Sequence, residues 1–147
     1  MSERAAIGCD LVFIPDLQAL VSEPASHFRL VFTDREWRQC QEKPNPLASL
    51  AGRWAAKEAV VKAWSHALAP SPSPIDPGDV VWSDIEILGD RHGRPQVFFH
   101  GRFRELMEAD AGATRDKTER ARQVHDKSFQ VTISHDGDYA SAWAIVQ

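Results

Sequence analysis

The sequence is poor in cysteine, has no long apolar run and carries no strong excess of charge of either sign. Its only cysteines, Cys9 and Cys40, are too few for a disulfide framework and form no CxxC pair. No run of about 18 apolar residues occurs, so no membrane-spanning segment is expected. The net charge of -4 argues against broad nucleic-acid binding. The N-terminus also lacks a signal-peptide pattern, so the sequence predicts a cytoplasmic protein that binds neither membranes nor nucleic acids.

The composition and the pattern of breaking residues favour one folded domain over residues 1–147. Hydrophobic residues make up 43% of the sequence, enough for a packed core, and the length is that of one ordinary domain. The expected strands cover 5–9, 82–88, 95–100, 129–133 and 140–146, and the expected helices cover 16–21, 34–41, 46–68 and 101–109. One strand, several helices and then further strands indicate an α+β fold rather than a parallel array. The charged stretch 110–127 is expected to be a solvated loop or a loose surface helix.

The longest expected helix begins after Asn45 and has two packing faces. Large apolar residues form one stripe, Leu50, Trp54, Val61 and Leu68. Small residues form another face, Gly52, Ala55, Ala56, Ala59 and Ala63. A second element is expected to pack closely against the small face, which leaves the charged residues of this helix in clefts or at interfaces.

Three groups on the chain could act as a site, although each has an ordinary structural explanation. Glu58 and Lys62 stand at the i,i+4 spacing of a helix salt bridge, and Glu58 could instead bind a metal ion. Asp10 follows the first strand and could cap the next turn. His135 could be a turn histidine that Asp136 holds in place. The residues taken singly do not decide between these readings.

Six stretches, taken together, resemble a known family. In chain order they are GCD (8–10), FTDREW (32–37), LAGRWAAKEAVVKAW (50–64), DIEI (84–87), GRP (93–95) and VTISHDGDYASA (131–142). The chain is similar to the holo-acyl-carrier-protein synthases, the small type of 4'-phosphopantetheinyl transferase, and most similar to their actinobacterial members. The resemblance spans nearly the whole chain.

The resemblance implies a function and an assembly. It implies magnesium-dependent transfer of 4'-phosphopantetheine from coenzyme A to a carrier-protein serine, which releases adenosine 3',5'-bisphosphate and serves fatty acid biosynthesis. The carrier would be an acyl carrier protein or a carrier domain within a fatty acid synthase. The implied fold is a small antiparallel sheet packed on a long central helix, assembled as a homotrimer with active sites between protomers.

The resemblance also assigns roles to individual residues. Asp10 and Glu58 would bind Mg²⁺, Glu58 or a metal-bound water would take the serine proton, and Lys62 would neutralise the pyrophosphate. His135 would act in the coenzyme A pocket with a role left open. The other residues expected to contact coenzyme A are Arg53, Gly93, Arg94, Pro95 and Ser134. Lys57 is a further possible phosphate contact, and Trp54 would form a wall of the site.

The sequence departs from many relatives in two places. The helix after Pro15 has no basic residue, whereas relatives use basic residues there to dock an acidic carrier. Carrier recognition would then rest on apolar contacts, on Arg29 or on a different carrier. The stretch 110–127 is longer than in compact relatives, and a tolerated insertion is the favoured interpretation.

Two other functions are compatible with such a sequence. One is a non-catalytic protein that binds coenzyme A or a nucleotide, which the intact set Asp10, Glu58, Lys62 and His135 disfavours. The other is a hydrolase that releases 4'-phosphopantetheine to water.

Overall fold

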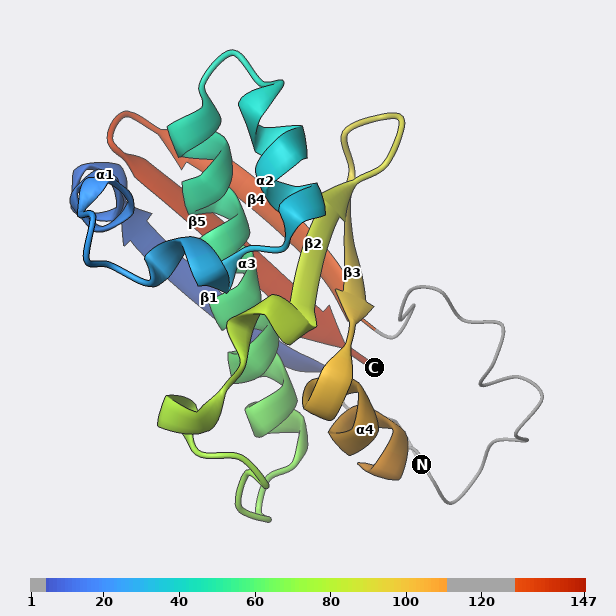
Figure 1. Cartoon of the computed structure of the whole chain (residues 1–147). Helices are drawn as coiled ribbons and strands as arrows, with labels where there is room; N and C mark the ends of the chain where they lie inside the picture. Colours follow the sequence, from blue (N-terminus) through green and yellow to red (C-terminus); the bar gives the residue numbers. More distant parts are fainter. Residues whose placement is uncertain (1–4, 111–128) are drawn as a thin grey trace.

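The computed structural model describes residues 5–110 and 129–147, so most of the charged stretch predicted over 110–127 lies outside the described part of the chain (Figure 1). The strands are β1 (Ala6–Phe13), β2 (Ile85–Gly89), β3 (Pro95–Phe99), β4 (Phe129–Asp136) and β5 (Tyr139–Val146). The α-helices are α1 (Ile14–Ser22), α2 (Asp34–Gln41), α3 (Pro46–Ala67) and α4 (Gly101–Asp110). Short 3₁₀ turns are η1 (Phe28–Val31), η2 (Pro77–Asp79) and η3 (Trp82–Asp84).

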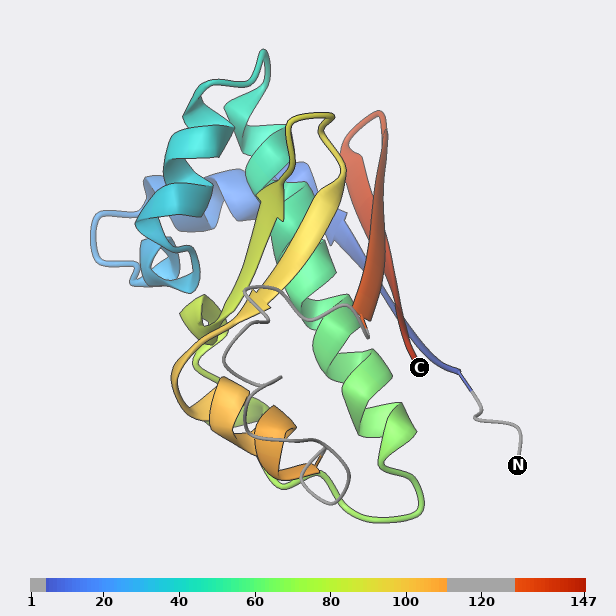
Figure 2. The same cartoon turned by 90° about the vertical axis from the view of Figure 1, so that its right-hand side faces the viewer.

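The strands form two antiparallel sheets, which confirms the predicted α+β class. One sheet has three strands in the order β1-β5-β4, and the other is the hairpin β2-β3. In the larger sheet Asp10 lies opposite Ala142, and Ala142 in turn lies opposite Ile133. Figure 2 shows α3 crossing between this sheet and the β2-β3 hairpin.

The helix α3 begins where its sequence predicts. The Asn45 side chain accepts a hydrogen bond from the Ala48 amide at 3.0 Å, and Pro46 takes the first turn. For the preceding helix α2, Thr33 followed by Glu36 is a sequence pattern that predicts a capping box, and the structure contains this capping box. Both helix starts are therefore determined by local side-chain chemistry.

The small face of α3 lies against β1 and β5, as predicted. A Cβ added to Gly8 would overlap the Ala59 carbonyl oxygen and the Ala63 amide nitrogen, so the β1 backbone passes directly over the helix. Ala59 and Ala63 are fully buried at this crossing. This contact fixes the position of β1 on α3, and Asp10 follows Gly8 on the same side of the strand.

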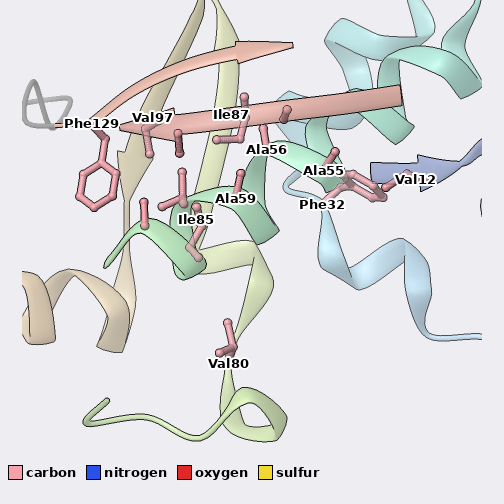
Figure 3. Packing of buried hydrophobic residues seen from close by; sticks show 14 of the residues in the cluster. Val12, Phe32, Ala55, Ala56, Ala59, Val80, Ile85, Ile87, Val97 and Phe129 are labelled. Atoms are coloured by element: carbon pink, nitrogen blue, oxygen red, sulfur yellow. The ribbon is translucent and has the colours of Figure 1, made fainter. Parts of the chain in front are cut away.

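The rest of the core fills the space between α3 and the two sheets (Figure 3). Ile85, Ile87 and Val97 contribute side chains from the hairpin, and Phe129 contributes one from β4. Trp64 lies on the same helix and packs against Phe103 of α4 at a ring distance of 4.9 Å. Core packing therefore accounts for Trp64.

The face of the three-stranded sheet that points away from α3 carries large apolar side chains, and no other part of residues 5–110 and 129–147 covers them. Burial alternates along β1 and β5, so every second residue points away from α3. The exposed apolar residues of this outer face are Ile7, Leu11, Phe13, Tyr139, Trp143 and Ile145. We call these six residues the outer sheet face.

Several element boundaries differ from the sequence predictions. β1 continues to Phe13 instead of ending near Cys9, because its pairing with β5 extends to Phe13 opposite Tyr139. β4 likewise extends to Asp136, so the turn is shorter than predicted. The first residues of the strand predicted over 82–88 form the turn η3 instead. Among the described residues no helix is both long and apolar enough to cross a bilayer.

Candidate active site

Asp10, Glu58 and Lys62 come together where β1 crosses α3. Glu58 and Lys62 directly precede the small residues Ala59 and Ala63, against which the β1 backbone packs. Asp10 stands two residues after Gly8 and therefore points to the same side of β1. The side chains of Asp10, Glu58 and Lys62 are 15%, 30% and 50% exposed, so the carboxylates are sheltered and the amine is more open.

The close partner of Lys62 is Asp10 and not Glu58. The Lys62 ammonium donates to Asp10 Oδ1 at 2.7 Å and to the Cys9 carbonyl at 3.2 Å. Its distance to Glu58 Oε2 is 4.0 Å, too long for a hydrogen bond. The helix salt bridge that the i,i+4 spacing suggests is thus only a loose contact, and the strong ion pair joins α3 to β1.

The charges of the three groups influence one another. Burial and the neighbouring Asp10 charge raise the pKa of Glu58, against the opposing effect of Lys62. The hydrogen bond to Asp10 raises the pKa of Lys62, together with the charges of Asp10 and Glu58. Two mutually repelling carboxylates that are partly shielded from water form a site where added positive charge is favourable.

The donor set suits a magnesium ion that is shared with a substrate. Within the described residues, no group of three or more His, Cys, Asp or Glu side chains could hold a metal ion by itself. Mg²⁺ needs no such cage, because it commonly takes one or two carboxylates together with substrate phosphates and water. Asp10 and Glu58 fit this mode of binding.

A hollow of about 220 Å³ opens beside the two carboxylates. The hollow lies between β1, α1, Phe28 and α3, and both polar and apolar residues line it. Its main lining side chains are Asp10, Asp16, Glu58, Leu17, Leu20, Phe28 and Trp54. Trp54 is thus a wall of the hollow, as expected, and it contacts Phe28 and Trp82 at ring distances of 5.3 and 4.7 Å. No sequence pattern marks Asp16 or Leu20 as site residues, since only the folded chain brings α1 to Glu58.

Arg53 and Lys57 are interior residues. The Arg53 guanidinium donates to the Ile87 carbonyl, Ser49 Oγ and Gln39 Oε1 at 3.0, 2.7 and 2.9 Å. Lys57 is fully buried and donates to Glu36 at 2.9 Å. These contacts explain both residues as links from α3 to α2 and β2, and they do not support the phosphate contacts that the sequence suggests.

His135 lies apart from the Asp10–Glu58–Lys62 cluster within one chain. Its Nε2 hydrogen-bonds the Ala48 carbonyl at 2.8 Å, and Ala48 precedes Glu58 by ten helical residues, or about 15 Å along the axis. The Ser134 side chain points to the side of β4 opposite to that of His135, because neighbouring side chains alternate along a strand.

The Gly93-Arg94-Pro95 turn joins β2 to β3 and also lies away from the cluster, on the other side of α3 from α1 (Figure 1). Gly93 has a φ of 77°, a conformation that favours glycine. Asp90 Oδ2 accepts from the Arg94 guanidinium at 2.8 Å, and Asp90 Oδ1 accepts from the Arg94 amide at 2.9 Å. Asp90 therefore holds an exposed arginine at the tip of the hairpin.

The helix α1 and the neighbouring residue Arg29 are the region where the sequence suggests carrier docking. This region exposes apolar side chains. Leu20 of α1 and Leu30 of η1 are exposed, and α1 has no basic residue in its last turn. Arg29 pairs with Asp34 at 2.8 Å and stacks over the Trp37 ring at 4.4 Å. Its guanidinium is thus already engaged within the chain.

Comparisons with known proteins agree with this architecture. The family model ACPS, described as the 4'-phosphopantetheinyl transferase superfamily, matches residues 6–144. The holo-[acyl-carrier-protein] synthase of Corynebacterium glutamicum is 37% identical over 143 residues, covering 96% of each chain. The synthase of the same name from Mycobacterium tuberculosis is 37% identical over 142 residues, which cover 96% of this chain and 95% of the relative.

Solved structures show the same fold. The Chronobacterium ammoniagenes ACPS-CoA complex superposes with a TM-score of 0.81 at 36% identity and covers 98% of this chain and 97% of that one. The acyl carrier protein synthase of Mycobacterium tuberculosis gives a TM-score of 0.67 at 32% identity over 97% of this chain and 96% of that one. The chain therefore belongs to the ACPS family of the 4'-phosphopantetheinyl transferase superfamily.

Proposed function

We propose that this chain transfers the 4'-phosphopantetheine group of coenzyme A to a serine of an acyl carrier protein or of a carrier domain in a fatty acid synthase. The observation that carries this proposal is the junction of β1 and α3, where Asp10, Glu58 and Lys62 meet beside a hollow in a chain of this family. The named relatives are holo-[acyl-carrier-protein] synthases, and one solved relative is a complex with CoA. The product would supply fatty acid biosynthesis.

The reaction moves one phosphoryl group between two oxygens. The serine oxygen forms a bond to the phosphorus that carries pantetheine, and the bond from this phosphorus to the bridging oxygen breaks. Adenosine 3',5'-bisphosphate leaves with that oxygen, and the serine proton passes to a base. Such transfers depend mainly on positioning and charge neutralisation. A partly buried carboxylate with a raised pKa, as in Glu58, suits the role of base.

Asp10 and Glu58 are the residues that would hold Mg²⁺. The bound ion would supply positive charge to the pyrophosphate of coenzyme A. The two carboxylates project from different elements, and the close packing of Gly8 on α3 keeps those elements in register. Asp10 and Glu58 would thus hold the ion, and with it the pyrophosphate, beside the hollow.

Lys62 would complete the charge balance. Its side chain is half exposed, so its ammonium can reach a phosphate next to the carboxylates. As the leaving pyrophosphate oxygen gains negative charge, a positioned cation stabilises the transition state. Lys62 would therefore affect the rate of transfer more than the fold.

Two features support a homotrimer with sites shared between protomers. The outer sheet face exposes six large apolar side chains, and such a patch favours association. His135 and the Gly93-Arg94-Pro95 turn lie away from Asp10 and Glu58 within one chain. In a trimer, these groups of one protomer would contact coenzyme A bound at the carboxylates of its neighbour.

The test is the modification of a carrier protein. The protein is incubated with coenzyme A, Mg²⁺ and either a free apo carrier or an isolated synthase carrier domain, and intact mass is measured. The added mass of one phosphopantetheine arm is expected, and a carrier with alanine at the acceptor serine should stay unmodified. Free 4'-phosphopantetheine formed without a carrier would indicate the hydrolase instead. Coenzyme A binding without any product would indicate a non-catalytic binding protein.

A further inference from the structure

The ammonium of Lys62 occupies the point where the oxygens of the site converge. It lies 2.7 Å from Asp10 Oδ1, 3.2 Å from the Cys9 carbonyl oxygen and 4.0 Å from Glu58 Oε2. No other side chain in the described ranges 5–110 and 129–147 hydrogen-bonds the Asp10 carboxylate. Lys62 is thus the counter-ion that β1 and α3 provide for this carboxylate.

The lysine is the part of this cluster that can move. Asp10 is sheltered, and its strand is locked on α3 by the contact of Gly8 with Ala59 and Ala63. Lys62 is half exposed, and its ammonium ends a flexible four-carbon stem. A new ligand at the carboxylates would therefore displace the lysine more readily than it would displace Asp10.

We propose that Lys62 is an internal cation that competes with the divalent metal ion for Asp10 and leaves this carboxylate when the metal ion binds. The proposal rests on the proposed function, because it takes Asp10 and Glu58 as the metal ligands. Two cations at one carboxylate oxygen repel each other, so a metal ion bound at Asp10 Oδ1 disfavours the ion pair between Asp10 and Lys62.

The competition couples two binding events. A lysine released from Asp10 is free to contact a phosphate, so binding of the metal ion prepares the positive charge that coenzyme A needs. By linkage, a phosphate that draws Lys62 away from Asp10 strengthens metal binding. The factor equals the one by which the metal ion strengthens phosphate binding. The same side chain therefore opposes metal binding alone and favours metal binding together with a phosphate.

The test measures Mn²⁺ affinity, in the absence of any nucleotide or coenzyme A, by isothermal titration calorimetry and by the electron paramagnetic resonance signal of free Mn²⁺. Lys62→Met keeps the length of the side chain and removes its charge. We expect this variant to bind Mn²⁺ about tenfold more tightly than the wild type. The variant has neither the ion pair with Asp10 nor the ammonium charge that repels the metal ion. Arg104→Gln is the matched control, because it removes one positive charge from an exposed pair with Glu108 and should leave the affinity unchanged.

Two further variants, Glu58→Gln and Asp10→Asn, distinguish a failure of the metal-ligand assignment from a failure of the Lys62 proposal. Glu58→Gln should abolish Mn²⁺ binding in both the wild-type and the Lys62→Met backgrounds. If Glu58→Gln and Asp10→Asn both leave binding unchanged, the metal assignment itself is wrong. If binding requires Glu58 but Lys62→Met binds no more tightly than the wild type, only the lysine inference fails. The ion would then enter from the hollow through the other carboxylate oxygens.

Chemical labelling of the wild-type protein tests displacement without a substitution. The rate of reductive methylation at Lys62, followed by peptide mass spectrometry, should rise several-fold when Mg²⁺ is added, because the amine loses its Asp10 partner. Exposed Lys43 is the internal control, and its rate should not change. An unchanged Lys62 rate at saturating Mg²⁺ would overturn the proposal.

Discussion

The ammonium of Lys57 lies 2.9 Å from the Glu36 carboxylate, with both side chains fully buried. Lys57 also donates to the carbonyls of Val31 and Trp82, at 2.8 and 2.9 Å. Glu36 accepts from the Ile87 amide at 2.8 Å. Burial lowers the pKa of Lys57, against the opposing effect of Glu36. The Lys57–Glu36 pair thus links α3 to α2 and β2. Lys57 directly precedes Glu58 in the sequence of α3.

Breaking the buried pair should destabilise the fold. We expect Lys57→Met to lower the free energy of unfolding by about 3–5 kcal/mol, because it leaves the buried Glu36 carboxylate without its counter-ion. Urea denaturation followed by circular dichroism measures the loss. The exposed Lys43→Met change should cost no more than about 0.5 kcal/mol. Equal stabilities of the two variants would show that the pair does not support the fold.

Glu86 should make stability depend on acid pH. Burial alone would raise its pKa, but hydrogen bonds from Arg35, Thr33 and His100 outweigh burial and lower the pKa from 4.5 to about 2. A carboxyl whose pKa is lower in the folded state stabilises the fold above pH 4.5, and this contribution disappears as the pH falls from 4.5 to 2. The shift corresponds to about 3 kcal/mol.

The measurement is the free energy of unfolding at several pH values in this window, in the wild type and in Glu86→Gln. The variant should lose the part of the acid dependence that Glu86 contributes. Glu105→Gln, at an exposed position of α4, should retain the wild-type slope. Identical slopes in all three proteins would contradict the assignment.

The crossing of β1 over α3 leaves no space for a methyl group at Gly8. Gly8→Ala should destabilise the protein by at least about 1–3 kcal/mol, because β1 must move off Ala59 and Ala63. It should also impair Mn²⁺ binding, since Asp10 moves with the strand. Gly78→Ala is the control, because a Cβ at Gly78 meets nothing within 4 Å. Thermal melting compares the two, and equal melting temperatures would refute the close contact.

The outer sheet face should control assembly. We expect the wild type to have the mass of a trimer by light scattering, and Trp143→Asp to dissociate it, because a charge replaces an apolar side chain that is 52% exposed in the single chain. Leu30→Asp changes a similarly exposed residue on η1 and should remain trimeric. A monomeric wild type, or a Trp143→Asp trimer, would argue against this interface.

The sequence predicts best those features that depend on neighbouring residues. The capping box of Thr33 and Glu36 and the Asn45 cap are local patterns, and both appear where expected. The small face of α3 is also readable, because helical periodicity determines which residues share a face. The sequence cannot show which partner meets a charged side chain across the fold. The i,i+4 spacing therefore predicts a salt bridge between Lys62 and Glu58 of the same helix, whereas the hydrogen-bond partner of Lys62 is Asp10 of β1.

The same limit explains why the sequence does not predict the buried positions of Arg53 and Lys57. Their spacing indicates a basic pair, but Ile87, Gln39 and Glu36 approach them from distant segments and bury them. The separation of His135 from Glu58 is likewise a property of strand order and not of sequence spacing.

Carrier modification by the wild type and by Glu58→Gln, under saturating coenzyme A and Mg²⁺, tests the proposed transferase activity directly. Glutamine keeps the volume of the side chain and removes its charge, so the variant should fold normally by circular dichroism. We predict that the wild type converts the apo carrier to the phosphopantetheinylated form and that Glu58→Gln gives no detectable product. Full activity in the variant, or an unmodified carrier with the wild type, would contradict the assignment of Asp10 and Glu58 as the centre of the transferase.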